Sequence, residues 1–206
     1  MKPNKRNYAL LGLVFLGAAA AVGAASLEKG EAVLDLDAAR TKVTFTLSDV
    51  LHPVHGEFKL KQGTVRFDLA TGLAGGAFVI DAASGSSGSA GRDRRMHKNI
   101  LESQKFPEIT FLPDHFEGHL APAGDSEIAL HGKFGIHGAE HEMTLKTAVH
   151  MTGGEVTATA HFVVPYVEWG IKNPSILLLH VGDKVNIDLQ AVGTVKSAPS
   201  VARPVR

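Results

Sequence analysis

Histidine dominates the residues that could carry chemistry: the chain of 206 residues has eleven of them, and imidazole is a common ligand of transition metals. Residues 137–141 have the His-x-x-Glu-His spacing of inverted zinc peptidases. That chemistry needs a helix, which places both imidazoles on one face with the glutamate beside the metal-bound water. Gly138 instead separates two alternating runs, which predicts a β-hairpin over residues 130–149. A metal-dependent hydrolase is therefore the least favoured alternative.

The remaining histidines offer a second alternative, a histidine-rich protein that binds a metal at its surface. Most of them stand at polar positions of expected strands or in loops, and the chain has no cysteine to complete a ligand set. We therefore prefer scattered surface histidines and predict no metal site. The histidines that could combine are His52, His55, His115, His119, His131, His137, His141 and His150.

Nucleophilic and cofactor chemistry have no sequence signature here. The serine- and glycine-rich residues 84–89 lack the Gly-x-Ser-x-Gly spacing of a nucleophile elbow and indicate a flexible loop. Neither a Gly-x-Gly-x-x-Gly pattern nor a P-loop occurs, so no nucleotide cofactor is expected. The formal net charge is zero without a basic patch, which argues against a nucleic-acid partner. We expect a protein that is not an enzyme and has no cofactor.

The first 25 residues have the three-part pattern of a secretory signal peptide. Lys2, Lys5 and Arg6 precede an uncharged apolar run over residues 9–22, and small residues follow at 23–26. The run is shorter than the roughly 20 residues of a membrane span, although a retained anchor is the alternative. No cysteine follows the run, which excludes lipoprotein processing. The pattern predicts cleavage near Ala25 and a periplasmic or secreted protein.

The rest of the chain is long enough for one domain and short for two. An exported protein without cysteine has no disulfides, so its stability must come from burial of apolar surface. We expect one domain over residues 33–195. The Pro- and Ala-rich end, residues 196–206, is predicted to be a disordered tail.

Apolar and polar residues alternate with a period of two over most of this domain. Such alternation is typical of antiparallel strands with one solvated face, and eight segments of this kind indicate an all-β barrel or sandwich. Gly153-Gly154 between two such runs predicts a hairpin turn, and residues 92–101 form the only good helical stretch. The inward positions include Val43, Phe45, Leu47, Val65, Phe67, Phe78, Ile80, Ile109, Phe111, Phe134, Val149, Val156 and Phe162.

Several segments in the same order resemble the YceI family of secreted lipid-binding barrels. They are residues 54–58 (Val-His-Gly-Glu-Phe), 92–97 (Arg-Asp-Arg-Arg-Met-His), 106–111 (Phe-Pro-Glu-Ile-Thr-Phe), 130–138 (Leu-His-Gly-Lys-Phe-Gly-Ile-His-Gly) and 181–187 (Val-Gly-Asp-Lys-Val-Asn-Ile). The resemblance covers about residues 33 to 195. It implies an eight-stranded, lipocalin-like antiparallel barrel with one short helix, which periodicity alone does not distinguish from a sandwich.

The resemblance also implies a function, the non-catalytic binding of a long apolar lipid such as a polyisoprenoid or an isoprenoid quinone. Transient membrane contact and a homodimer are compatible with this function. A barrel of eight strands leaves room for packed side chains or for one slim ligand. We expect the lipid tail to contact Phe45, Leu47, Phe67, Phe78, Ile80, Phe111, Phe134 and Phe162.

Two groups of residues could receive the polar head of such a lipid. One is Arg92, Asp93 and His97 on the helix, although Asp93 could instead stabilise the helix N-terminus while Arg92 pairs with a strand carboxylate. The other is the loop before the last strand, with Tyr166, Trp169 and Lys172. We favour the loop, because Tyr and Trp combine an apolar body with a polar group. This aromatic loop and the helix sequence, which lacks the family's usual Arg-Asp-x-His-Leu, leave the ligand's identity open.

Overall fold

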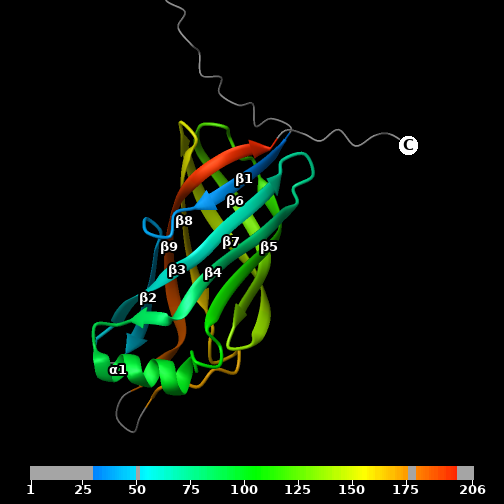
Figure 1. Cartoon of the computed structure of the whole chain (residues 1–206). Coiled ribbons are helices and arrows are strands. Elements are labelled where there is room, and N and C mark those ends of the chain that lie inside the picture. Colours follow the sequence, from blue (N-terminus) through cyan, green and yellow to red (C-terminus); the bar gives the residue numbers. More distant parts are fainter. Residues whose placement is uncertain (1–29, 50–51, 176–179, 199–206) are drawn as a thin grey trace, which may run out of the picture.

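The computed structural model describes residues 30–49, 52–175 and 180–198, and most of these residues are in strands (Figure 1). The predicted signal peptide and residues 199–206 of the predicted tail lie outside the described residues. Residues 196–198, predicted as the start of that tail, instead belong to the last strand, where they pair with the first. None of the helices in the described ranges is long and apolar enough to cross a membrane. The strands are β1 (Glu31–Leu36), β2 (Lys42–Asp49), β3 (Val54–Asp68), β4 (Ala74–Ser86), β5 (Glu108–Gly118), β6 (Gly124–Ile136), β7 (Ala139–Thr152), β8 (Glu155–Val164) and β9 (Val181–Ala198).

The nine strands form one closed antiparallel sheet with eight strand positions, because β1 and β2 share a position between β3 and β9. Leu34 of β1 pairs with Val65 of β3 and Val195 of β9. Phe45 of β2 pairs with other residues of the same two strands, nearer the opposite end of the barrel. β3 also pairs with β4, which closes the ring. The predicted eight-stranded barrel is confirmed, and a sandwich of two separate sheets is excluded.

Alternation along each strand explains why the barrel has an apolar interior. In β8, Val156, Ala158, Ala160 and Val164 are buried, whereas the intervening Thr159 and His161 are exposed. Each inward side chain removes apolar surface from water, at roughly 25 cal/mol per Å². The sequence therefore specifies which face of each strand is inside, and a shift of one residue would reverse it.

The hairpin predicted at Gly153-Gly154 is confirmed between β7 and β8. Both glycines have positive φ, 59° and 85°, as a two-residue type I′ turn requires. The short β1 was not expected as a strand, since the clear alternation begins only after residue 40. β1 has only two buried inward residues, Ala32 and Leu34. It is nevertheless a strand of the sheet because its backbone pairs with β3 on one side and β9 on the other.

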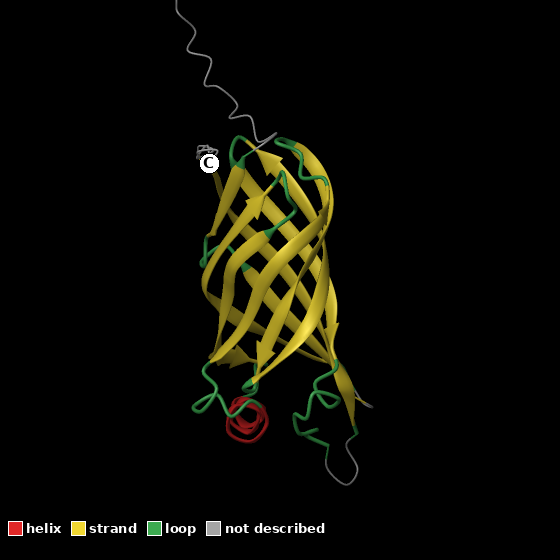
Figure 2. Ribbon diagram, turned by 90° about the vertical axis from the view of Figure 1, so that its right-hand side faces the viewer, coloured by secondary structure: helices red, strands yellow, loops and turns green. Residues whose placement is uncertain are grey.

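A single helical segment lies across one end of the barrel (Figure 2). It begins as α1 (Ala90–Arg95) and continues as one π-helical turn, η1 (Met96–Ile100), close to the predicted 92–101. His97 ties it to β4, because its Nε2 donates a hydrogen bond to the Gly85 carbonyl at 2.8 Å. The opposite end holds the start of β1 and the end of β9, where Glu31 pairs with Ala198.

Candidate ligand-binding cavity

The barrel encloses a cavity of about 570 Å³, within the range of about 300–1,000 Å³ typical of small-molecule sites. Its wall is formed by inward side chains of all nine strands and is almost entirely apolar. The eight side chains predicted to contact a lipid tail all line it: Phe45, Leu47, Phe67, Phe78, Ile80, Phe111, Phe134 and Phe162. They come from six strands, and closure of the barrel turns all of them toward one space.

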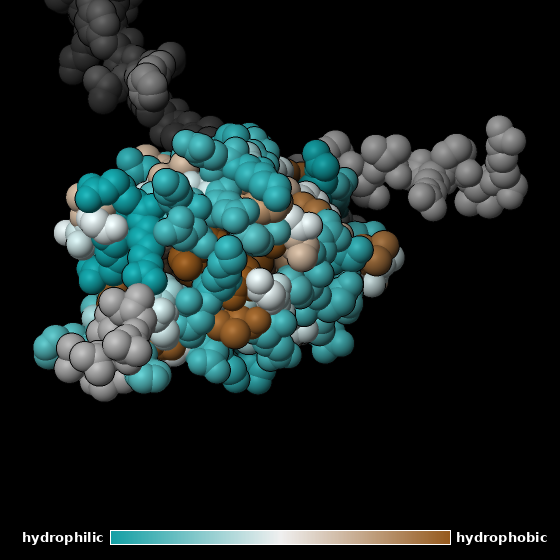
Figure 3. Space-filling view, turned by 90° about the horizontal axis from the view of Figure 1, so that it is seen from below, coloured by the Kyte–Doolittle hydropathy of each residue, from teal (hydrophilic) through white to brown (hydrophobic). Residues whose placement is uncertain are grey.

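The cavity is filled at one end and open at the other. Near the end where β1 begins, Val65 and Val156 are only 0% and 2% exposed. Toward the helix end, Leu47 and Phe58 line the cavity and are only half-buried, because they face it. Figure 3 shows apolar residues at the centre of the helix end, surrounded by hydrophilic ones. The mouth of the cavity therefore lies beside the helix.

The helix forms one side of the mouth. Arg92, Arg95, Met96 and Ile100 contribute to the cavity lining. Arg95 was not predicted, although it stands three residues after Arg92 and so shares its helix face. Neither a hydrogen bond nor an ion pair engages the Arg95 guanidinium within residues 30–49, 52–175 and 180–198, so this cation is available at the mouth.

Arg92 and Asp93 are both committed to Ser87, in the loop before the helix. The Asp93 carboxylate accepts hydrogen bonds from the Ser87 amide at 2.8 Å and from the Ser87 hydroxyl. These bonds, the hydroxyl first, hold the pKa of Asp93 below its usual value. The Arg92 Nε donates to the Ser87 hydroxyl at 2.7 Å, and its Nη2 donates to the Ser87 carbonyl at 2.9 Å. Arg92 thus bonds to a serine and not to the strand carboxylate named as its alternative partner. Together, Arg92 and Asp93 hold the loop that precedes the helix.

The loop between β8 and β9 forms the other side of the mouth. Tyr166, Ile171 and Pro174 line the cavity there. The Tyr166 hydroxyl donates to the Gly182 carbonyl at 2.7 Å. Burial of the phenol, with a smaller contribution from the Asp183 carboxylate, raises the pKa of Tyr166 to about 12. The ring is thereby held as an apolar wall with its polar group already paired.

Trp169 lies behind this wall and is not part of the cavity lining. Its ring stacks on His141, with centroids 4.0 Å apart and planes 4° apart. It also contacts Phe134, at 5.7 Å between centroids. Lys172 in the same loop is exposed. Trp169 packs onto the barrel end through Phe134, and its predicted contact with a lipid head remains a prediction.

The His-x-x-Glu-His spacing does not form a metal site. His137 lies in the β6–β7 turn with φ 53°, and its Nε2 faces the Glu102 carboxylate at 3.5 Å. Glu140 is on the outer face of β7, where it pairs with Lys133. His141 stacks on the aromatic loop instead. The three side chains diverge as expected for a hairpin, because successive strand residues point to opposite faces.

The fold and the cavity define a small closed β-barrel with an apolar interior that opens at one end, an arrangement suited to holding a slim apolar molecule. The chain belongs to the YceI-like family: the YceI-like domain matches residues 34–193. The family predicted from the sequence is thereby confirmed. Among curated proteins, none matches the sequence.

Solved structures share the fold at low sequence identity. BcnA from Burkholderia cenocepacia is 23% identical with a TM-score of 0.63, and the match covers 78% of this chain and 100% of BcnA. A polyisoprenoid binding domain from Saccharophagus degradans, implicated in plant cell wall breakdown, is 16% identical with a TM-score of 0.60, covering 79% and 98%. The YceI protein of Campylobacter jejuni is 15% identical with a TM-score of 0.53, covering 73% and 88%. At these identities the likeness concerns the fold.

Proposed function

We propose that this protein binds a long apolar lipid, a polyisoprenoid or an isoprenoid quinone, and carries it without chemical change in the periplasm or outside the cell. The observation that carries the proposal is the cavity of about 570 Å³ with an almost wholly apolar wall and a mouth at the helix end. The similar domain from Saccharophagus degradans is described as polyisoprenoid binding, which supports this class of ligand.

Burial of an isoprenoid tail provides the driving force. Each isoprene unit has five carbons, and about 0.8 kcal/mol per buried carbon corresponds to roughly 4 kcal/mol per unit before ordering costs. The aromatic side chains along the cavity supply flat, rigid surface for such a tail. A carrier of this kind keeps a water-insoluble tail out of water while the lipid moves between membranes.

The polar head of the lipid belongs at the mouth, because an unpaired polar group inside the barrel would cost several kcal/mol. The mouth offers the guanidinium groups of Arg92 and Arg95 on one side and the Tyr166 ring on the other. Our sequence-based preference was the loop, with Trp169 as its main contact. The helix and the loop stand on opposite sides of the opening, so a comparison of variants can separate their contributions.

The first test is native mass spectrometry of the protein purified from its own host, followed by lipid extraction. The expected result is a non-covalent adduct whose extract is an isoprenoid lipid. A protein that carries no lipid and takes up none from isoprenoid-containing vesicles would contradict the proposal. Intact mass tests the export proposal with the same material, and a retained Met1 would count against it.

The second test compares three alanine variants for retention of the extracted lipid. Trp169→Ala alters the loop behind one side of the mouth, whereas Arg95→Ala removes a lining side chain from the other side. Arg94→Ala is the matched control because Arg94 is exposed and does not line the cavity. Arg95 is a cleaner choice than Arg92, whose bonds to Ser87 also hold the loop. Weaker retention in Trp169→Ala alone supports the loop as the head-group site. Weaker retention in Arg95→Ala alone assigns the head group to the helix.

A further inference from the structure

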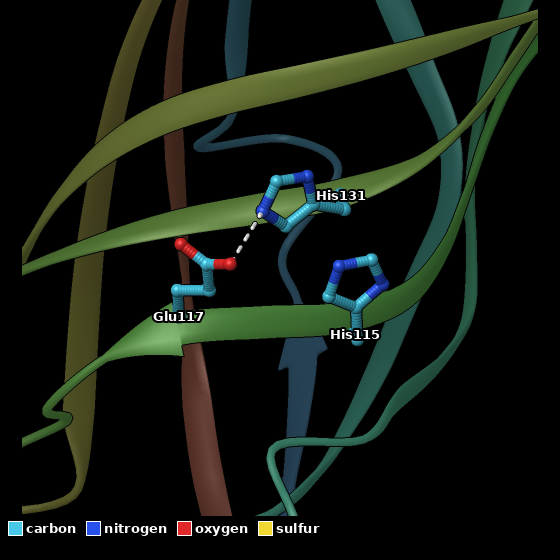
Figure 4. Close-up of side chains that lie close together, drawn as sticks. All are labelled: His115, Glu117 and His131. Carbon is cyan, nitrogen blue, oxygen red and sulfur yellow. Dashed lines mark ion pairs between the residues drawn. The ribbon is translucent and has the colours of Figure 1, made fainter.

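A second cluster of chemically active side chains lies on the outer wall of the barrel, away from the cavity. It consists of His115 and Glu117 on β5 and His131 on the neighbouring β6 (Figure 4). One nitrogen or oxygen atom from each residue lies within 4.8 Å of the others. The imidazole rings are stacked with centroids 4.1 Å apart, and His131 Nε2 is 3.9 Å from Glu117 Oε1.

A β-bulge in β5 brings the two histidines together. Pro113 pairs with Gly132 and His115 pairs with His131, so Asp114 is an extra residue on the β5 side. The bulge turns both Asp114 and His115 outward, whereas uninterrupted alternation would turn His115 toward the interior. Pro113 suits this place because it has no N–H to donate to the ladder.

The Nδ1 atom of each imidazole is already engaged by a second residue. His115 Nδ1 bonds to an Asp114 carboxylate oxygen at 2.5 Å, and since a carboxylate only accepts, the proton is on Nδ1. His131 Nδ1 bonds to the Thr144 hydroxyl at 2.7 Å. Metal-binding histidines have this arrangement, in which an outer oxygen holds one nitrogen and the other nitrogen faces the ion.

The remaining nitrogen of His131 is buried without a partner. Among the residues that the structure describes, nothing forms a hydrogen bond to His131 Nε2, although the atom is shielded from solvent. A buried polar atom of this kind is costly unless something occupies the space beside it. The atom points toward Glu117, so the three side chains share one small space (Figure 4).

We propose that His115, Glu117 and His131 bind one divalent transition-metal ion, with Zn²⁺ as the reference. Two imidazoles and one carboxylate are a common zinc ligand set, with ligand distances of about 2.0–2.2 Å and a fourth position open to water. The ring planes are 8° apart, so coordination requires one ring to turn about its Cβ–Cγ bond. His115 can do so because about half of its side chain is exposed.

This site is independent of lipid binding. Phe116, between His115 and Glu117, points into the core, and the three ligands point to the outside of the wall. An ion there touches no residue of the cavity lining. A test with metal alone therefore separates failure of this proposal from failure of the proposed lipid binding.

The barrel surface also supplies matched controls. His150 pairs with Asp125 at 2.7 Å, and His161 pairs with Asp188 at 2.8 Å. Each is an exposed imidazole beside a carboxylate, but neither belongs to a group of three metal-binding side chains in the described part of the chain. A His150→Gln variant thus removes one surface histidine without touching the cluster.

The experiment is isothermal titration of chelator-treated protein with Zn²⁺, repeated with Co²⁺ for its coordination spectrum. The parent is expected to bind one equivalent and to give a four-coordinate Co²⁺ spectrum, as is His150→Gln. His131→Gln and Glu117→Gln should lose the stoichiometric site. Thr144→Val should keep it with about 10–100-fold weaker affinity, because it removes the bond that orients His131.

His115→Gln separates loss of a ligand from loss of the fold. The His115 side chain is exposed, so the variant should have the same thermal unfolding temperature as the parent. It is expected to abolish the site in a folded protein. The proposal is overturned if the parent takes up no stoichiometric metal, or if His115→Gln and His131→Gln bind Zn²⁺ as the parent does.

Discussion

Ala158 offers a direct test of the cavity, because it lines the cavity wall with the smallest chiral side chain. It lies on β8 between two inward-facing partners, Val149 on β7 and Ala191 on β9. Replacement by leucine adds three carbons that point into the cavity. An empty apolar space accepts them, whereas a packed core would have to move.

The expected effects on stability and on lipid binding have opposite signs. Three buried carbons at about 0.8 kcal/mol each stabilise the lipid-free barrel by about 2.4 kcal/mol. Ordering the leucine side chain costs about 0.5–1 kcal/mol, which leaves a net gain of about 1.4–1.9 kcal/mol. The same carbons occupy space needed by a lipid tail, so lipid retention should fall.

Urea unfolding of delipidated protein measures the first effect, and native mass spectrometry after incubation with the extracted lipid measures the second. Ala148→Leu is the matched control, because Ala148 is exposed on β7 and its change should stay within about 0.5 kcal/mol. A destabilised Ala158→Leu variant that retains lipid as well as the parent would refute the reasoning, since the barrel would then be packed at this depth.

Three further variants test individual contacts. Tyr166→Phe should remove the tyrosinate absorbance step near pH 12, because burial in the parent raises the pKa of this phenol to about 12; a step near the usual pKa of a free tyrosine, about 10, in the parent would contradict this. Asp93→Asn should lower the free energy of unfolding at pH 7, because it weakens the hydrogen bonds to Ser87. The pKa of the Asp93 carboxyl is lowered in the folded protein, so the difference from the parent should shrink as the pH falls below about 4. Equal differences at pH 7 and pH 3 would count against this role. Gly132→Ala should destabilise the barrel by about 1–3 kcal/mol in urea unfolding, because the added Cβ would overlap the Leu112 carbonyl across the β5–β6 pair; an unchanged midpoint would show that the strands can move apart freely.

The interior of the barrel was predictable from the sequence because it depends on a local rule. Inward positions recur every second residue, so the alternating runs identified the residues that line the cavity, including Phe45, Phe111 and Phe162. The helix was predictable for a similar reason, since Met96 and Ile100 share one face and both border the cavity.

Features that depend on contacts between distant segments were not predictable. The shared position of β1 and β2 follows from the register of both with β9, more than 130 residues later. The bulge at Asp114 reverses the alternation of β5, so periodicity could not show that His115 faces His131. Trp169 was placed at the pocket mouth for its chemistry, whereas its position follows from stacking on His141 of β7.

The pairing of Glu31 with Ala198 places both ends of the described chain at the pole of the barrel opposite the mouth. A surface or fusion partner joined directly at either end of the described chain therefore leaves the opening unobstructed, so the protein can be immobilised for lipid exchange measurements.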